Sequence, residues 1–441
     1  MLWEQKVEYA ALSDIGFRRK NNEDSYVVQV ATDRVQWDAR GHLFLVADGM
    51  GGHAVGELAS KIAADTIPHT YHKLNDLDVQ AALEQAIRAG HDAIHLRGQQ
   101  NLDFMKMGTT CTTLVLSRHG AVLGHVGDSR AYRIRGQRIE QLTFDHSLQW
   151  ELLKQGRMSP EDIFLHEPRN VITRSLGPQP NVEIDIEGPY PVRPGDVYLM
   201  CSDGLSTLVS DEEMGVIARE LPPVDACQFL VDLANLRGGT DNVTVIVARV
   251  GEIPAGLPDL APPPDEYEQA GGWGWGWLLG FLGVGLTFIF GNALAALEKP
   301  LEGILLEGLG ALGIAGMTIA WLRQRRLNLQ NASLPEITPG TPYRTASAQV
   351  TRKFVSEIGA LEYSLQRTAI EEDWTIEWRN HNIHYDAAKT ALSERRYSDA
   401  LREYAKTIHV LMGGIQLQRR QRDLAIRWKV KNSAERGAMP P

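Results

Sequence analysis

The sequence predicts an α+β fold, in which a central antiparallel β-sandwich flanked by helices is followed by a transmembrane helical hairpin and a helical C-terminal region. Up to residue 250, strand-type segments, two helices, further strands and a late helix succeed one another without regular β-α-β alternation. This order favours an antiparallel sandwich over a doubly wound sheet. Acidic residues stand at the ends of several strands, and beyond residue 250 the stretch from Trp273 to Leu297 carries no charge.

The composition indicates two or three domains and argues against a nucleic-acid-binding protein. The chain has 441 residues and a formal net charge of −10, opposite in sign to a surface that binds nucleic acid. Its 3 cysteines form no C-x-x-C pair, so we expect buried, reduced thiols in a reducing compartment. The N-terminus lacks the pattern of a signal peptide, so the first domain is expected to stay in the cytoplasm.

Hydrophobic periodicity gives the order of elements in the first domain. A short strand near Tyr9 leads into a polar loop, and a variable loop is expected at 31–41. The predicted strands are 27–30, 43–47, 109–116, 121–126, 131–135, 182–186, 197–201 and 243–250. The predicted helices are 57–67, 79–96, 147–156 and 224–236. Residues 157–180 are irregular and rich in proline, and we expect a mobile flap there.

Four aspartates at strand ends are the strongest functional signal in the chain. Asp48 and Asp203 each follow an apolar strand and precede a glycine, Asp128 follows a third strand, and Asp241 stands just before a fourth. One such Asp-Gly is typical of an ordinary turn, but its recurrence indicates more. Carboxylates from distant segments converge only if their strands lie side by side, and they then need cations to stay ionised.

The polar loop after the first strand combines cations with acids. Arg18, Arg19 and Lys20 stand shortly before Glu23 and Asp24. The loop is either a solvated turn or an anion clamp, because arginine is suited to a bidentate grip on phosphate oxygens. In the second interpretation, the acids orient metal-bound water.

Eight short motifs occur in order over roughly residues 5–250. They are Arg19…Asn22-Glu23-Asp24, Asp48-Gly49-Met50-Gly51-Gly52-His53, Gly108-Thr109-Thr110, Gly127-Asp128-Ser129-Arg130, Leu142-Thr143-x-Asp145-His146-Ser147, Asn170-Val171-Ile172-Thr173-x-x-Leu176-Gly177, Ser202-Asp203-Gly204 and Asp241-Asn242-x-Thr244. As a set they resemble the metal-dependent serine/threonine phosphatases of the phosphatase 2C (PPM) family in their bacterial form. The resemblance implies a β-sandwich flanked by helices, with two Mn²⁺ or Mg²⁺ ions between the sheet ends.

The resemblance also implies roles for the strand-end residues. Asp48 would bridge the two metal ions, and the backbone carbonyl of Gly49 would bind one of them. Asp203 and Asp241 would be ligands of the second ion. Asp128, together with Asp203, would form the third metal site that is found in bacterial members.

The same resemblance implies functional roles for residues of the polar loop. Glu23 and Asp24 would hold metal-bound waters. Arg19 would bind the phosphate, with Arg18 as its nearest competitor and Lys20 as a weaker one. These assignments make Arg19, Glu23 and Asp24 the predicted catalytic residues.

The leaving-group acid and the mechanism complete this prediction. Some family members have a histidine directly after Asp-Gly, where this chain has Met50, so the general acid is either His53 or a metal-bound water. Oxygen-only ligands suit Mn²⁺ or Mg²⁺ rather than zinc. Two such ions would lower the pKa of a bridging water and direct its in-line attack on phosphorus, without a phosphoenzyme.

The composition divides the whole chain into five parts. They are the catalytic domain 1–252, an acidic proline-rich linker 253–272, two transmembrane helices within 273–322, a second linker 323–350 and a helical tail 351–441. Arginines at 323–326 should remain on the cytoplasmic side, which predicts a multi-pass inner-membrane protein with both ends in the cytoplasm. The alternative is a buried, soluble helical hairpin, and Glu307 is the residue that fits the membrane least.

The tail is predicted to be helical. Phe354, Ile358, Leu361 and Leu365 share one helical face, and the segment from Tyr385 to Ile408 resembles one tetratricopeptide-type helical hairpin. A small helical bundle or a dimerising segment is the alternative. The last stretch is basic and either lies on anionic lipid or forms a solvated helix. Its charged residues are Arg419, Arg420, Arg422, Arg427, Lys429 and Lys431, around Trp428.

The predicted function is a membrane-anchored, Mn²⁺- or Mg²⁺-dependent protein serine/threonine phosphatase. Its substrates would be phosphoproteins modified by a serine/threonine kinase, and its other partners would be the lipid bilayer and a protein bound by the tail. The alternative from another class is a catalytically inert membrane scaffold, which uses the phosphatase fold and the tail to recruit partners.

Overall fold

The structure of the chain is a computed structural model in which most residues are described. The described residues are 7–52, 54–154, 171–251 and 342–437, with scattered positions between 301 and 318. The chain divides into two compact units. The first contains residues 1–262 and 339–441, and the second contains residues 263–338.

The predicted transmembrane hairpin at 273–322 lies outside the described residues, apart from those scattered positions, and so does the linker at 253–272. Among the residues that the structure describes, none of the helices has both the length and the apolar character needed to cross a membrane. The hairpin therefore stays a prediction. The first part of the predicted flap, residues 157–170, also lies outside the described residues.

Two antiparallel sheets form the centre of the first unit, as the sequence predicts. The first sheet has the order β1-β11-β10-β7-β8-β12, and the second has the order β2-β3-β5-β6-β9, with β4 paired to β3. The strands of the first sheet are β1 (Val7–Asp14), β11 (Val243–Val250), β10 (Val197–Cys201), β7 (Arg130–Arg135), β8 (Arg138–Gln141) and β12 (Arg344–Ser347). Those of the second are β2 (Asp24–Gln29), β3 (His42–Met50), β4 (Gly108–Thr109), β5 (Cys111–Ser117), β6 (Gly120–Val126) and β9 (Asp185–Tyr190).

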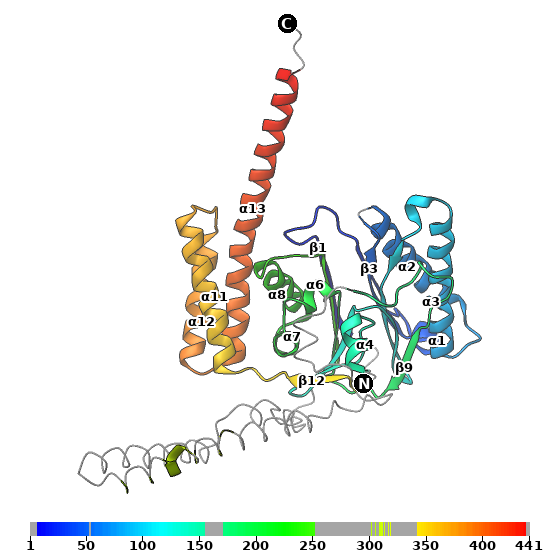
Figure 1. The fold of residues 1–441 in the computed structure, drawn as a ribbon, viewed down its shortest axis with the longest axis horizontal. Coiled ribbons are helices and arrows are strands. Elements are labelled where there is room, and N and C mark those ends of the chain that lie inside the picture. The colour runs from blue at the N-terminus through cyan, green and yellow to red at the C-terminus, as the bar shows by residue number, and fades with distance from the viewer. Residues whose placement is uncertain are drawn as a thin grey trace. The chain divides into compact units, whose positions relative to one another are not determined.

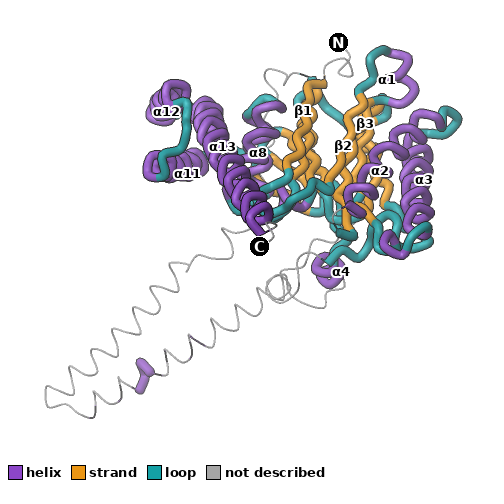
Figure 2. Tube along the Cα trace, turned by 90° about the horizontal axis from the view of Figure 1, so that it is seen from above, coloured by secondary structure: helices purple, strands orange, loops and turns teal. Residues whose placement is uncertain are grey.

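Helices cover the outer faces of both sheets, as Figures 1 and 2 show. Alternating apolar residues of the strands fill the space between the sheets, where Phe44, Leu114, Tyr198, Met200 and Ile246 are buried in one cluster. Two helices pack on the second sheet, and two others pack on the first. They are α2 (Ala54–Lys73) and α3 (Val79–Gln99), and α7 (Asp211–Glu220) and α8 (Pro223–Leu236). The short elements are α1 (Arg34–Arg40), η2 (Leu102–Phe104), α4 (Leu148–Lys154) and α6 (Asp203–Ser206).

Helices α1 and α7 form in segments where the sequence predicted no helix. Residues 34–40 form α1 within the expected variable loop, where the side chain of Asp33 caps the helix by accepting a hydrogen bond from the backbone N–H of Gln36. Helix α7 begins with a capping box between Ser210 and Glu213. Such reciprocal hydrogen bonds satisfy the free N–H groups of the first turn and stabilise helices too short to show a clear periodicity.

The C-terminal region belongs to the same unit as the sandwich. The end of the segment predicted as a linker, 323–350, contains β12, which pairs antiparallel with β8 and so extends the first sheet. Three helices follow it and pack on the outer side of α8 (Figure 2). They are α11 (Arg352–Glu371), α12 (Trp378–Ser393) and α13 (Tyr397–Gly437).

The predicted apolar face of the tail is confirmed. Ile358 is buried, and Phe354, Leu361 and Leu365 pack against the same hydrophobic cluster, which continues through α8 to the first sheet. Helices α12 and α13 form a helical hairpin around buried alanines. Its likeness to a tetratricopeptide repeat stays a prediction.

Candidate metal centre and phosphate-binding loop

Strand register brings the first two predicted acids together. Strand β2 pairs antiparallel with β3, and this pairing sets Asp24 directly opposite Asp48. Strand β3 is buried from His42 to Val46 because it lies between β2 and β5 and is covered on both faces. Asp48 is held at its end by Thr110, whose backbone N–H donates to the Asp48 carbonyl at 2.8 Å.

The other three aspartates come from neighbouring strand ends. Asp203 opens α6 directly after β10, Asp241 stands before β11, and β10 and β11 are paired. Asp128 follows β6 and precedes β7, which is the other neighbour of β10. Gly204 is required for this approach, because a Cβ atom there would lie 2.0 Å from the carbonyl oxygen of Asn242.

Several of these carboxylates are buried without full hydrogen bonding. Asp24 is 8% exposed and Asp128 is 7% exposed. Asp24, Asp128 and Asp203 each have a buried Oδ1 atom that finds no hydrogen-bond partner among the described residues. The second oxygen of Asp24 accepts a 2.8 Å hydrogen bond from Ser202. Buried carboxylate oxygens without donors are costly, so these residues indicate a site for cations rather than a source of stability.

Burial and mutual repulsion raise the pKa of this cluster. Burial raises the pKa of Asp24 to about 7, and the charges of Asp203 and Asp241 add to the rise against hydrogen bonds from Thr244 and Ser202. Burial, followed by the charge of Asp241, raises the pKa of Asp203 to about 6.

Asp48 lies at the electrostatic centre of the group. Burial raises its pKa well above the usual range, and the largest further contribution is the charge of Asp24. Asp203, Asp128 and Asp241 contribute in the same direction. The pKa of Asp128 is also raised, by burial and then by Asp203. The carboxylates therefore lie near one another, as the sequence predicts, and their negative charges repel one another.

The donor set fits a hard divalent cation. Its donors are carboxylate oxygens with unsatisfied lone pairs, which is the chemistry that Mn²⁺ and Mg²⁺ prefer. Among the described residues, no three His, Cys, Asp or Glu side chains are already arranged as a ready-made ion site. The five metal-ligand assignments therefore stay predictions, supported by the donor chemistry.

Glycines allow the backbone at Gly49 to pack closely against Glu23 and the start of α2. The backbone N–H of Gly49 donates to the carbonyl of Glu23 at 3.1 Å. A Cβ atom on Gly49 would lie 2.1 Å from the carbonyl oxygen of Gly56, and one on Gly56 would lie 2.2 Å from Oε2 of Glu23. Glu23 is 8% exposed, and its backbone N–H is held by the side chain of Asn242 at 2.8 Å.

The cationic loop reaches the acidic cluster through Arg19. The Arg19 Nη2 atom donates to Oδ2 of Asp241 at 2.6 Å. The backbone N–H groups of Phe17 and Arg18 donate to the carbonyl of Gly239, at 2.8 and 2.9 Å, and so tie the loop to the segment before Asp241. The ion pair favours Arg19 over its competitors as the phosphate-binding residue. His53, the candidate general acid, lies outside the described residues.

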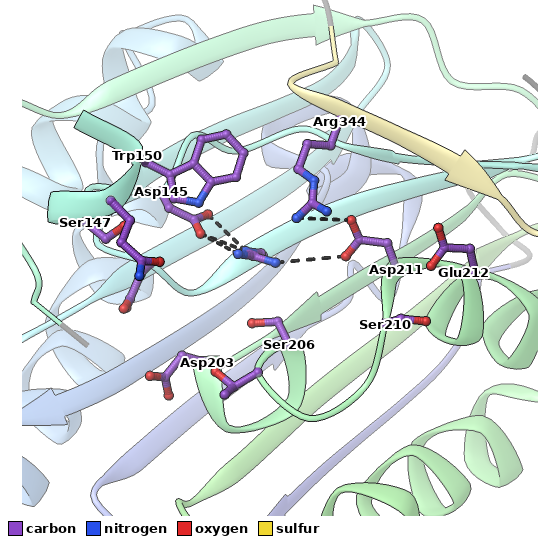
Figure 3. A pocket seen from close by; sticks show the side chains of 13 residues that line it. Asp145, Ser147, Trp150, Asp203, Ser206, Ser210, Asp211, Glu212 and Arg344 are labelled. Atoms are coloured by element: carbon purple, nitrogen blue, oxygen red, sulfur yellow. Dashed lines mark hydrogen bonds and ion pairs between the residues drawn. The ribbon is translucent and has the colours of Figure 1, made fainter. Parts of the chain in front are cut away.

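A charged pocket of about 290 Å³ adjoins the acidic cluster on the side of Asp128 and Asp203 (Figure 3). Arg130 lies inside it, 2.6 Å from Asp145 and 3.9 Å from Asp211. Arg344 of β12 also contacts Asp211, at 3.6 Å. The pocket is therefore built partly by the C-terminal region.

Known proteins resemble the N-terminal part of the chain. The Protein phosphatase 2C family matches residues 20–234. PstP of Mycobacterium tuberculosis, a serine/threonine protein phosphatase, is 39% identical over 246 residues, which are 55% of this chain and 45% of PstP. The protein phosphatase PhpP of Streptococcus pneumoniae is 34% identical over 250 residues, which are 56% of this chain and 98% of PhpP.

The chain belongs to the protein phosphatase 2C family. A crystal structure of the M. tuberculosis serine/threonine phosphatase PstP/Ppp is 38% identical, covers 56% of this chain and 99% of that chain, and has a TM-score of 0.50. A second structure, of the PstP catalytic domain in complex with two manganese ions, is 36% identical with a TM-score of 0.47 and covers 56% of this chain and 99% of its own. The chain covers less than half the length of full PstP, at 45%.

The protein phosphatase 2C match ends well before the C-terminal region. It stops at residue 234, whereas Arg344 and the tail helices lie beyond that point. Sequence reasoning identified Arg130 and Asp145 as motif residues but did not predict their ion pair. It assigned no role to Arg344, because only tertiary pairing of β12 with β8 reveals its place in the pocket.

Proposed function

We propose that the chain is a Mn²⁺- or Mg²⁺-dependent protein phosphatase that hydrolyses phosphoserine and phosphothreonine in proteins. One observation carries this proposal: strand-end aspartates from both sheets are buried against one another with unsatisfied oxygens. Arg19, the predicted phosphate-binding arginine, lies 2.6 Å from one of them. The relatives PstP and PhpP are named as protein phosphatases, which supports the same activity here.

The residues that would hold the ions are those of the acidic cluster. Asp48 and the carbonyl of Gly49 would serve one ion, and Asp48, Asp203 and Asp241 would serve the other. Asp128 with Asp203 would form a third site. When bound, the ions would activate water for attack and neutralise the charge of the phosphoryl group.

The side chains of the polar loop would position the reactants. Arg19 would bind two phosphoryl oxygens through its guanidinium, and Asp241 orients that group at 2.6 Å. Glu23 and Asp24 would accept hydrogen bonds from the attacking water and its neighbours. Asp24 is suited to this role because Ser202 fixes one carboxylate oxygen at 2.8 Å while the other remains without a donor among the described residues.

The charged pocket gives the substrate a place beside the phosphorylated residue. Its walls carry acids and hydroxyl groups as well as Arg130 and Arg344. A pocket of about 290 Å³ is large enough for one side chain of a substrate protein and too polar for an apolar ligand. The pocket would therefore accept a polar or charged side chain of a phosphoprotein substrate.

We also propose that the protein is anchored in the inner membrane by the hairpin at 273–322. The sequence supports two membrane spans, and the fold supports an even number of spans. The catalytic sandwich and the tail belong to one unit, since β12 pairs with β8. Both ends of the intervening segment must therefore lie on one side of the membrane, as an even number of spans requires. Carbonate extraction tests the anchor, because release into the supernatant would contradict it.

Phosphate release from a phosphothreonine peptide tests the enzymatic proposal. The full chain should release phosphate with Mn²⁺, and EDTA should abolish the release. The matched control is Asp48→Asn, which should be inactive under both conditions. Absence of release by a protein that still binds Mn²⁺ would contradict the proposal and favour the inert membrane scaffold.

A further inference from the structure

Helix α13 contacts the loop that carries the proposed phosphate-binding arginine. The guanidinium of Arg419 lies over the ring of Phe17, 3.9 Å from its centroid. The Nη2 atom of Arg419 also donates a 2.6 Å hydrogen bond to the backbone carbonyl of Phe17. Arg419 thus binds both the side chain and the backbone of a residue that is 402 positions away.

The opposite side of the same loop is bound by the segment before β11. The N–H groups of Phe17 and Arg18 share the carbonyl of Gly239. Gly239 has a positive φ of 49°, and a Cβ atom there would lie 2.6 Å from the Phe17 nitrogen. Gly16 is equally constrained, since its Cβ would lie 2.1 Å from the carbonyl oxygen of Asp241. The two backbones therefore meet at a distance that only glycine permits.

Residues 16–19, which we call the Arg19 loop, are therefore held from two sides. Gly239 binds the loop from within the sandwich, and Arg419 binds it from the tail. Phe17 also packs at the edge of the hydrophobic cluster that contains residues of α13. Arg18, Arg19 and Lys20 are exposed, and Arg19 is further bound by its ion pair with Asp241.

We propose that Arg419 is a positioning residue, which sets the affinity of the active site for phosphate by fixing the Arg19 loop. This inference rests on the proposed function, because it takes Arg19 as the phosphate-binding group. A cation stacked on an aromatic ring and donating to a backbone carbonyl restricts both rotation of the Phe17 side chain and displacement of the backbone. Helix α13 would thereby influence phosphate binding through the Arg19 loop.

Arg419→Ala in the full chain tests the proposal. We expect the KM for a phosphothreonine peptide and the inhibition constant for inorganic phosphate to rise about five- to tenfold, with a smaller change in kcat. Arg419→Lys should recover part of the loss, because it retains a cation over Phe17 without the planar fork of donors. The matched control is Arg420→Ala, which removes the neighbouring exposed arginine and should leave KM unchanged.

Two measurements show whether the effect passes through Arg19. In an Arg19→Ala background, adding Arg419→Ala should produce no further rise in KM. Hydrogen exchange should be faster in Arg419→Ala at the amides of Phe17 and Arg18, which donate to Gly239, while exchange in α2 and α3 stays unchanged. An unchanged exchange rate at these amides, or an unchanged KM despite faster exchange, would overturn the proposal. So would an equal rise in KM in the Arg19→Ala background.

The positioning role of Arg419 can be tested even if the proposed enzymatic function is wrong. If the wild-type chain shows no metal-dependent hydrolysis, the enzymatic proposal fails, and calorimetric titration with inorganic phosphate in the presence of Mn²⁺ replaces KM. Weaker phosphate binding by Arg419→Ala than by Arg420→Ala would still support the positioning role. Equal binding by the two variants, or no phosphate binding by any form of the chain, would overturn it.

Discussion

The catalytic sandwich and the helical tail bury carboxylates in opposite ways. In the sandwich, the largest charge contributions to the pKa of Asp48 come from other aspartates, and they raise it. In the tail, Glu362 is fully buried, and its Oε1 atom lies 2.7 Å from Nε2 of His381, which is also fully buried. Its Oε2 atom has no hydrogen-bond partner among the described residues, but the group that faces Glu362 is an imidazole and not another carboxylate. Repulsion among like charges opposes folding, whereas a buried acid paired with an imidazole is costly to break once the pair has formed. The first arrangement therefore indicates a binding function, and the second indicates structure.

The largest expected effect comes from neutralising an acid of the sandwich. Asp48→Asn and Asp203→Asn should each lower turnover more than about a hundredfold, since even residues that only support metal ligands cost ten- to a hundredfold. The metal-free variants should also unfold at a higher temperature than the wild type, because a repelling charge is lost. Turnover assays and thermal unfolding test both statements. An active Asp48→Asn protein would contradict the inference that the acidic cluster of the sandwich binds the catalytic metal ions.

Neutralising the buried acid of the tail should have the reverse effect. Glu362→Leu leaves the Nε2 atom of His381 buried without its partner and should lower the free energy of unfolding by about 1–3 kcal/mol. Turnover by the folded protein should stay near that of the wild type. Urea unfolding measures the loss, and the double variant with His381→Leu is the control, in which part of the stability should return. If Glu362→Leu instead stabilised the protein, the buried acid of the tail would oppose folding just as the acids of the sandwich do, and the two regions would not differ in this respect.

The stability of the metal-free protein should depend on pH because of the aspartates in the sandwich. The pKa values of Asp24 and Asp203 are raised to about 7 and about 6, so their folded forms bind protons more tightly than the unfolded chain does. Their contribution to stability is fully present below pH 4 and is lost as the pH rises through 6 to 7. The unfolding temperature in EDTA should therefore fall between pH 5 and pH 8.

Excess Mn²⁺ is the control for that experiment. Bound ions require ionised carboxylates, so the stabilisation by Mn²⁺ should increase over the same pH range. A metal-free protein whose stability rises from pH 5 to pH 8 would contradict the mutual repulsion of these aspartates.

The smallest expected effect concerns the contact between the two regions. The hydrogen bond that His409 of α13 donates to Asp232 of α8 raises the pKa of His409, although burial opposes the rise. The resulting attachment of the tail is complete below the ordinary histidine pKa of 6.5 and weakens as the pH rises through the higher folded-state pKa. Hydrogen exchange in α13 should thus be faster at pH 8 than at pH 6, after correction for intrinsic rates. His409→Gln should remove this difference, which is a few tenths of a kcal/mol because the His409 side chain is exposed to solvent.

The sequence predicts the acidic cluster because its signals are local. Apolar strands that end in aspartate and glycine, such as those at Asp48 and Asp203, can be identified without knowledge of their neighbours. Helix α7 was missed although Ser210 and Glu213 have the spacing of a capping box. Strand β12 carries no such signal, because Arg344 to Ser347 form a short polar strand that exists only through its pairing with β8.

Contacts between distant segments were beyond sequence reasoning for a physical reason. Arg419 was predicted to lie on lipid or in solvent, because a basic stretch has the same composition in either case. Its contact with Phe17 depends on the packing of α13 against α8, which fixes where the helix passes the sandwich. The same holds for Arg344, whose place beside Asp211 follows from the extension of the first sheet.

The return of the chain as β12 makes the folded unit discontinuous in sequence. The chain leaves the first sheet at the end of β11 and rejoins it at the opposite side as β12, after the whole of the second unit. A single proteolytic cut in the intervening segment would therefore not release the tail. The two fragments would remain associated through the β8–β12 ladder and the packing of α13 on α8, and they would purify together. For the same reason, two separately expressed halves of this protein should reconstitute one catalytic unit.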